Sequence, residues 1–201
     1  IHSEIQSMIA SGHYKPDEIK EIKRFQYLTL GEMEELIALA EGKWLQPVLV
    51  TLTYTGMRRG EIMSLEWANV DLEARYLHVG SRKQSTRHQK VVRNIPIHDK
   101  LLPILKEQKK KTGKFRWVFV GPAGQQLKAS TLRETFLRLT EGTHFEGIGF
   151  HVFRHSMASN LAARGVEQHY IDGILGHQTE AMRQRYKHLF PGHVTEAINR
   201  L

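Results

Sequence analysis

Residues 150–157 read Phe-His-Val-Phe-Arg-His-Ser-Met, and this stretch decides how the whole chain is interpreted. Apolar side chains recur every four residues from Phe153 to Leu161, which predicts a helix with one buried face. His151 lies well away from that face, Arg154 borders it, and both occupy the first turn. Unpaired backbone N–H groups and the helix dipole favour an anion at this end of a helix. The pair would suit a phosphate site, but taken alone this pattern is a weak signal, and ordinary surface side chains account for it more often.

The same stretch also has the spacing of a metal site. His151 and His155 stand four residues apart, as two ligands on one helix face would. However, Arg154 would place a positive charge beside the metal, and the glutamate of a His-Glu-x-x-His motif is missing. With 12 histidines in the chain, such a spacing is expected by coincidence. We therefore expect no metal here, and no other cofactor.

A second informative stretch, residues 55–61, reads Thr-Gly-Met-Arg-Arg-Gly-Glu. Gly56 and Gly60 bracket an expected tight junction between two helices. Arg58 would project from the end of this junction. Glu61 is spaced to hold a guanidinium by a charge-assisted hydrogen bond, which gives it a supporting role. An ordinary surface pair of arginine and glutamate is the alternative.

The charge balance favours an anionic partner. Lysine and arginine number 29 against 21 acidic residues, which gives a formal net charge of +8. Nucleic acid is the first candidate, although a merely soluble basic protein has the same balance. Residues 82–93 contain no acidic residue and lie between two expected strands, so we predict a basic hairpin against the DNA backbone. Its candidate DNA-binding residues are Arg82, Arg87, His88, Lys90 and Arg93.

The remaining patterns predict a mainly helical domain with a small antiparallel sheet, an α+β fold. The chain contains no cysteine, so disulfides and thiolate sites are excluded, and no stretch approaches the roughly 18 apolar residues of a membrane span. Thr29 and Glu32 form a capping-box signature, and Ser130 is expected to cap a later helix. Helices are expected over 29–41, 45–55, 61–65, 101–108, 130–140, 150–163, 167–175, 180–186 and 193–201, and strands over 76–79, 91–97 and 117–120.

Two further motifs connect these pieces. Leu175-Gly176-His177 forms one, and Tyr186, nine residues beyond that histidine, is the other. In this order the motifs resemble the active-site series of the tyrosine recombinases, the phage integrase family, over about residues 29–189. The resemblance implies that the catalytic residues are Arg58, Lys83, His151, Arg154, His177 and Tyr186. Lys90 competes with Lys83, whose distance from Arg58 matches the family better.

The chemistry of a phosphodiester accounts for part of this set. A tyrosine hydroxyl, with a pKa of about 10, must lose its proton as it attacks. Arg58 and Arg154 would bind the nonbridging oxygens, because a guanidinium is planar and stays protonated. The resemblance implies that His151 helps to deprotonate Tyr186. It also implies a 3′-phosphotyrosyl intermediate that needs neither ATP nor metal.

The resemblance supplies two further roles and the expected partners. Lys83 would protonate the departing 5′ oxygen, and His177 would hydrogen-bond a nonbridging oxygen. Family members carry a separate DNA-clamping domain, so we interpret residues 1–25 as a remnant or linker and residues 26–201 as the catalytic domain, which alone should bind DNA weakly. The expected partners are double-stranded DNA, further copies in a tetramer, and accessory DNA-bending proteins. The expected location is cytoplasmic and nucleoid-associated, with no membrane contact. The segment 193–201 would pack either within its own chain or on a neighbouring subunit.

Two rival functions remain at this stage. A type IB topoisomerase shares the tyrosine chemistry, although His151 and the Leu175-Gly176-His177 box resemble recombinases better. Relaxation of a plasmid without joining of two sites would favour that rival. A DNA-binding module without catalysis is the second alternative, and it would bind DNA without a covalent adduct.

Overall fold

The computed structural model describes residues 27–80 and 92–176, and there the predicted α+β fold is confirmed. None of the helices within these ranges has the length and apolar character needed to cross a bilayer. The strands are β1 (Val70–Asp71), β2 (Tyr76–Gly80) and β3 (Val92–Pro96). The helices are α3 (Leu30–Ala38), α4 (Gln46–Thr55), α5 (Arg59–Met63), α6 (Leu102–Thr112), α7 (Ala129–Thr140), α8 (His151–Ala163) and α9 (Gln168–Leu175), with a 3-10 turn at Trp67–Asn69.

Local sequence signals set the start of some helices but not of others. The N–H of Glu32 donates to Thr29 Oγ1 at 3.2 Å and the N–H of Thr29 donates to Glu32 Oε2 at 2.7 Å, so the predicted capping box is confirmed. The prediction that Ser130 caps a helix is wrong, because α7 begins one residue earlier, at Ala129, without a side-chain cap. Leu127 is buried just before it, so core packing rather than a cap determines where α7 starts.

The sheet in the described residues is antiparallel, in the order β1-β2-β3. The two longer strands are those that the sequence predicts, and they pair so that Val79 lies opposite Arg93. β1 is too short to show a period-two pattern in sequence. The prediction of a strand over 117–120 is wrong. There the chain forms only isolated bridges, such as that between Trp117 and Glu66, because its neighbours are loops rather than strands.

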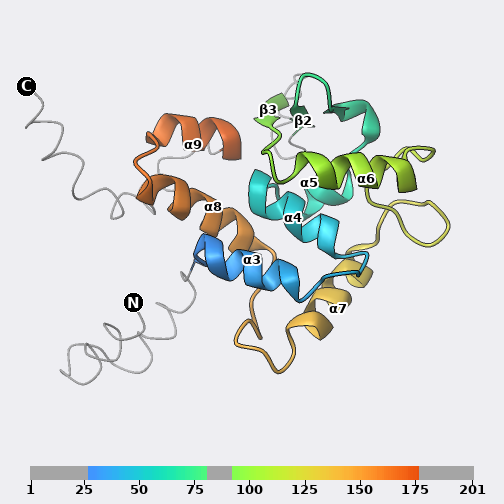
Figure 1. Cartoon of the computed structure of the whole chain (residues 1–201), viewed down its shortest axis with the longest axis horizontal. Helices are drawn as coiled ribbons and strands as arrows, with labels where there is room; N and C mark the ends of the chain where they lie inside the picture. The colour runs from blue at the N-terminus through green and yellow to red at the C-terminus, as the bar shows by residue number, and fades with distance from the viewer. Residues whose placement is uncertain (1–26, 81–91, 177–201) are drawn as a thin grey trace, which may run out of the picture.

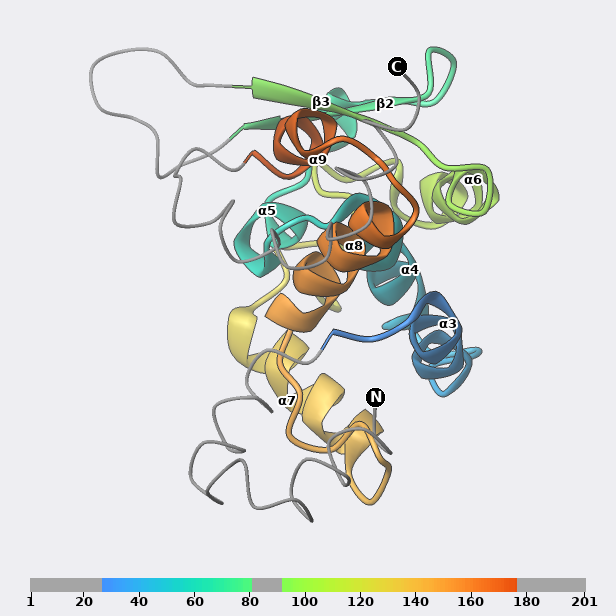
Figure 2. The same cartoon turned by 90° about the vertical axis from the view of Figure 1, so that its left-hand side faces the viewer.

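Helix α4 is the centre of the fold. Its neighbour Leu45 and its own Leu49 and Leu52 have no exposed surface, and the helix packs against α3, α5, α6 and α8. α9 lies between the sheet and α8, as Figure 2 shows, and it contacts both. α7 lies at the end of the domain opposite the sheet (Figures 1 and 2). The C-terminal end of α9 is close to β3, because Arg93 of β3 binds the carbonyl oxygen of Ile174.

Helix α8 is buried on more than one side. Phe153 is fully buried, as predicted, but Met157 and Leu161 are only partly buried. Ala158 and Ala162 are fully buried instead. The reason is that α8 packs against α3, α4 and α9 at once, and a helix surrounded by neighbours does not show one apolar stripe in its sequence.

The segment just before α3 is tied to α8. The backbone N–H of Leu28 donates to Ser156 Oγ at 2.7 Å, and Asn160 Nδ2 donates to the carbonyl oxygen of Leu28 at 2.8 Å. Both backbone groups of Leu28 therefore have a partner on the same helix.

Gly56 ends α4 in the left-handed conformation, at φ 58°. A Cβ at this position would lie 2.8 Å from Met157 Sδ and would collide with Leu175 Cδ2. By contrast, a Cβ at Gly60 would meet nothing within 4 Å, because Gly60 lies on the open side of α5. Of the two glycines that the sequence places at this junction, only Gly56 is required by the packing.

Replacing Gly56 with alanine should destabilise the domain. The left-handed backbone costs a non-glycine residue about 1–2 kcal/mol, and the overlap with α8 and α9 should add about 1–3 kcal/mol. Urea denaturation measures the loss. The matched control is Gly60→Ala, which should be neutral or stabilise the helix by up to about 1 kcal/mol. Equal unfolding free energies for the two variants would contradict the close approach at Gly56.

Candidate active site

Arg154 lies in the first turn of α8 and is 4% exposed. Its Nη1 donates to the carbonyl oxygen of Gly56 at 3.0 Å, across 98 residues of sequence, and its Nη2 donates to the carbonyl oxygen of Leu175. These carbonyls stand at the C-terminal ends of α4 and α9, where the helix dipole favours a cation. One guanidinium from α8 thus joins the ends of two other helices.

Arg58 lies between α4 and α5, and its side chain is 30% exposed. Glu61, in the first turn of α5, accepts a hydrogen bond from the backbone N–H of Arg58 at 2.7 Å and another from its Nη1 at 2.9 Å. The contact between Arg58 and Glu61 that the sequence suggests is present. It fixes both the backbone and the guanidinium of Arg58.

Arg93 requires a correction, because it does not face outward as a DNA-contacting side chain. It is 9% exposed, and its Nη1 and Nη2 donate to the two carboxylate oxygens of Glu61 at 3.0 and 2.7 Å. Its Nε donates to the carbonyl oxygen of Ile174 at 2.9 Å. Strand geometry explains this position, since Arg93 shares one face of β3 with the buried Ile95. The sequence carries that signal, because Arg93, Ile95 and Ile97 alternate along the expected strand.

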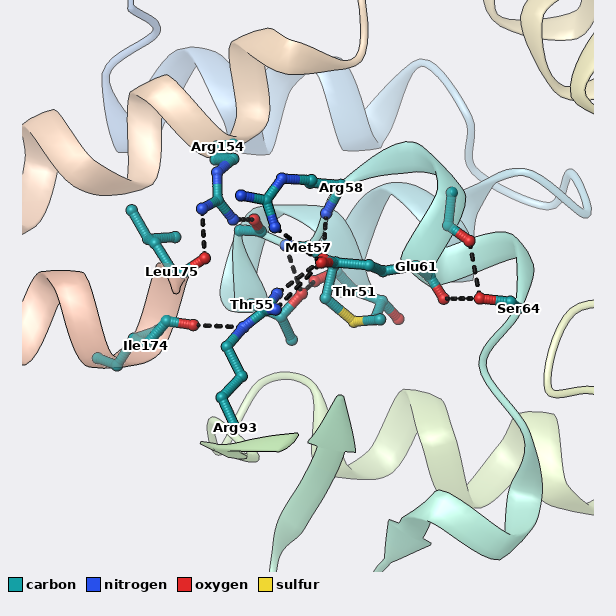
Figure 3. Close-up of polar contacts among 12 residues, drawn as sticks. Thr51, Thr55, Met57, Arg58, Glu61, Ser64, Arg93, Arg154, Ile174 and Leu175 are labelled. Atoms are coloured by element: carbon teal, nitrogen blue, oxygen red, sulfur yellow. Dashed lines mark hydrogen bonds and ion pairs between the residues drawn. The ribbon is translucent and has the colours of Figure 1, made fainter. Parts of the chain in front are cut away.

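Figure 3 shows the guanidinium groups of Arg58, Arg93 and Arg154 gathered at the junction of α4 and α5. Arg93 reaches it from β3 and Arg154 from α8. Glu61 Oε1 accepts from both Arg58 and Arg93, and the Gly56 carbonyl that Arg154 binds lies two residues before Arg58. The structure therefore brings together Arg58 and Arg154, the two arginines that the sequence assigns to one phosphate.

The carboxylate of Glu61 offsets part of this positive charge. Its side chain is 9% exposed, and burial by itself raises the pKa of the carboxyl. The hydrogen bonds and charge of Arg93, followed by the backbone N–H and charge of Arg58, act in the opposite direction and hold the pKa of Glu61 below its ordinary value. Glu61 is consequently a carboxylate at neutral pH.

His151 begins α8 and is exposed, in agreement with its expected position away from the buried face. His155, one turn later, is half-buried. Within 27–80 and 92–176, no group of three or more His, Cys, Asp or Glu side chains is placed to hold a metal ion. Among the described residues, no third side chain of these types lies with His151 and His155 in a position to bind a metal ion.

The other predicted site residues lie outside the described residues, so their assignments stay predictions. They are the catalytic Lys83, His177 and Tyr186 and the DNA-binding Arg82, Arg87, His88 and Lys90. What the sequence reasoning missed is the set of backbone acceptors. The carbonyls of Gly56, Ile174 and Leu175 hold the arginines, and no residue type signals such a role.

This chain belongs to the phage integrase family, whose sequence pattern matches residues 26–193. The resemblance drawn from the motifs is confirmed by that match. A tyrosine recombinase XerC-like protein of Caldanaerobacter subterraneus subsp. tengcongensis is 27% identical in an alignment 203 positions long, gaps included, which covers 85% of this chain and 52% of that protein. The chain therefore spans about half the length of this curated relative.

Solved structures show the same fold. The crystal structure of the XerA recombinase matches with a TM-score of 0.71 and 25% identity, over 87% of this chain and 64% of that one. A lambda integrase tetramer bound to a Holliday junction matches with a TM-score of 0.62 and 24% identity, over 77% of this chain and 47% of that one. At that identity the second similarity concerns the fold alone.

The ion pairs of Glu61 should make stability depend on pH in acid. Because its pKa is depressed in the folded state, the unfolded chain takes up the proton first as the pH falls. The stabilisation should be complete at neutral pH and should be lost below the pKa of an unfolded glutamate, about 4.3. Urea unfolding between pH 7 and pH 3 should show wild type losing stability more steeply than Glu61→Gln.

At neutral pH the same Glu61→Gln variant should be less stable by about 1–3 kcal/mol, because the buried Arg93 loses its anionic partner. Stability curves of wild type and variant that run parallel through the acid range would contradict an ionised, paired Glu61.

Proposed function

We propose that this chain supplies the catalytic domain of a site-specific DNA recombinase or integrase, which cuts and rejoins strands through a 3′-phosphotyrosyl intermediate. Membership of the phage integrase family supports the class of reaction. The observation that carries the proposal is the meeting of Arg58 and Arg154 at the C-terminal end of α4, because one phosphate can reach two guanidinium groups only if the fold unites them.

Charge explains why the two arginines would matter. A phosphodiester repels nucleophiles, and negative charge on its oxygens grows as a fifth ligand approaches phosphorus. Arg58 and Arg154 would bind the nonbridging oxygens, and their planar, permanently charged groups suit that geometry. Both are held by neighbours before any DNA arrives, so little reorganisation is needed. Preorganised donors of this kind contribute roughly 3–4 kcal/mol each in comparable sites.

The other assigned groups complete the cycle. Tyr186 would attack phosphorus while His151 helps to remove its proton, Lys83 would protonate the departing 5′ oxygen, and His177 would donate to a nonbridging oxygen. The phosphotyrosyl bond retains the energy of the broken linkage, so a 5′-hydroxyl of another strand can reverse the step. The exposed position of His151 at the start of α8 supports a role in proton transfer.

The partners follow from this reaction. Double-stranded DNA is the substrate, and recombination between two sites requires several active centres, for which we propose a tetramer. The tetramer reported for lambda integrase on a Holliday junction supports that number by analogy of fold. We further propose that residues 26–201 form the catalytic domain, that residues 1–25 link it to a DNA-clamping domain, and that accessory DNA-bending proteins take part. A cytoplasmic, nucleoid-associated location would suit a DNA substrate.

Replacing Tyr186 with phenylalanine should abolish the covalent adduct with DNA and leave DNA binding intact, because only the nucleophilic oxygen is removed. The probe is a duplex that carries a recombination junction sequenced from cells expressing the full natural protein. A nick beside the cleavage position lets the freed strand diffuse away. Denaturing gel electrophoresis then measures the protein–DNA adduct.

Two controls accompany this assay. Excess EDTA should leave the adduct yield unchanged, and strong inhibition would point to a metal-dependent reaction instead. Adduct formation by Tyr186→Phe at the wild-type level would exclude Tyr186 as the nucleophile. Relaxation of supercoiled plasmid without any joining of two sites would show that the protein acts as a topoisomerase and not as a recombinase.

In the same assay, Arg58→Ala or Arg154→Ala should reduce cleavage at least about 100-fold, since each loses a charge that stabilises the transition state. His177→Ala should lose less, because it removes a single hydrogen-bond donor. Circular dichroism of each variant checks that the fold is retained. A folded Arg58→Ala protein with wild-type adduct yield would contradict the assignment of this arginine to the phosphate.

A further inference from the structure

Arg93 is a buried charged residue that the proposed chemistry does not use. It stands within β3 on the face that packs against α9, and it is 9% exposed. Removing a guanidinium from water is costly unless its N–H groups find acceptors. Here Nη1 and Nη2 bind Glu61 and Nε binds the carbonyl of Ile174. The position of this side chain is therefore determined by three hydrogen bonds to two different elements.

The first of these elements leads directly to Arg58. Glu61 Oε1 accepts from Nη1 of Arg93 at 3.0 Å and from Nη1 of Arg58 at 2.9 Å, and Oε2 accepts from Nη2 of Arg93 at 2.7 Å and from the backbone N–H of Arg58 at 2.7 Å. The carboxylate can hold Arg58 in one orientation only if the carboxylate is itself fixed. Arg93 fixes it from the opposite side, through a bidentate contact.

The second element is the end of α9. Arg93 holds the carbonyl of Ile174 and Arg154 holds that of Leu175, the next residue. Gly176 follows in the left-handed conformation, at φ 65°, and a Cβ there would lie 3.3 Å from Arg93 Cδ. Two guanidinium groups from different elements thus bind consecutive carbonyls at the point where α9 ends.

Stability alone does not explain the choice of arginine at this position. Replacing a buried ion pair by apolar side chains of similar volume is often neutral or stabilising. Lysine would supply the charge, but as a single point charge it cannot bind both oxygens of Glu61 and a separate carbonyl together. The fork geometry of arginine is what the three contacts use.

We propose that Arg93 is a positioning residue, which acts through Glu61 to hold the guanidinium of Arg58 in the orientation that binds the scissile phosphate. This inference rests on the proposed function, and it goes beyond it by assigning a role to a buried residue outside the proposed catalytic set. Its consequence is specific: loss of Arg93 should mimic a partial loss of Arg58.

The test compares two DNA probes. One is the nicked junction duplex with its natural scissile phosphate, and the other carries a neutral methylphosphonate there, which lacks the negative charge that Arg58 would bind. The proteins, in their full natural length, are wild type, Arg58→Ala, Arg93→Lys and Glu61→Gln. Single-turnover rates of adduct formation are measured on both probes, with thermal unfolding in parallel.

On the natural phosphate, Arg93→Lys and Glu61→Gln should slow cleavage by about 100-fold, the size of effect that a misplaced catalytic group produces, and Arg58→Ala should slow it further. On the methylphosphonate, all three deficits should shrink together. Arg93→Met gives a second substitution of the same side chain if lysine prevents folding, and Glu61→Gln probes the link from the other side.

Arg75→Lys is the matched control. Arg75 also binds a carboxylate, that of Asp99, and a backbone carbonyl, that of Ile97 at 3.3 Å, but it has no contact with Glu61. It should cleave both probes at the wild-type rate.

The outcomes separate the two proposals. A deficit of Arg93→Lys that is equal on both probes, while that of Arg58→Ala shrinks, would reduce Arg93 to a purely structural residue and overturn the inference. Wild-type rates for folded Arg93→Lys, or for folded Glu61→Gln, would overturn it as well. If wild type itself forms no adduct with the natural probe, the proposed function fails, and the positioning role fails with it.

Discussion

The carboxylate of Glu61, held between the guanidinium groups of Arg58 and Arg93, is the interaction on which the candidate site depends. Without an anion at this point, two cations would be forced together inside the protein, where solvent screens them poorly. With it, the cations are drawn to one place and their orientations are set. For Arg154, the carbonyls at the ends of α4 and α9 supply negative partners. The domain thus assembles positive charge by pairing each guanidinium with a fixed acceptor.

The fold could be predicted from the sequence wherever one local signal outweighed its surroundings. The capping box at Thr29 and the glycine that ends α4 are such signals, and both predictions are confirmed. Prediction failed where tertiary packing decides. Ser130 has the chemistry of a cap but stands inside α7, and residues 117–120 have the composition of a strand but find only loops as neighbours. The buried face of α8 was predicted only in part for a related reason. The helix packs against three other helices, and they bury faces that a single apolar stripe does not reveal.

The site was predictable in part. Residue type and spacing predict that Arg58, Glu61 and Arg154 belong to one site, and the structure brings the three side chains to one junction. Arg93 was assigned wrongly because a run of positive charge suggested a surface, although the alternation with Ile95 pointed inward. The carbonyls that hold the arginines could not be inferred at all. Every residue has a carbonyl group. Which carbonyl accepts from which arginine depends on how distant segments pack, since the two residues are 98 positions apart in one pair and 81 in another.

The two hydrogen bonds at Leu28 also bear on how the domain is connected. Both polar backbone groups of this residue are held by side chains of α8, the helix that carries Arg154. The orientation of the backbone at Leu28 is therefore fixed relative to α8. A domain joined to the chain ahead of residue 27 would therefore be tethered beside α8, the helix that carries Arg154.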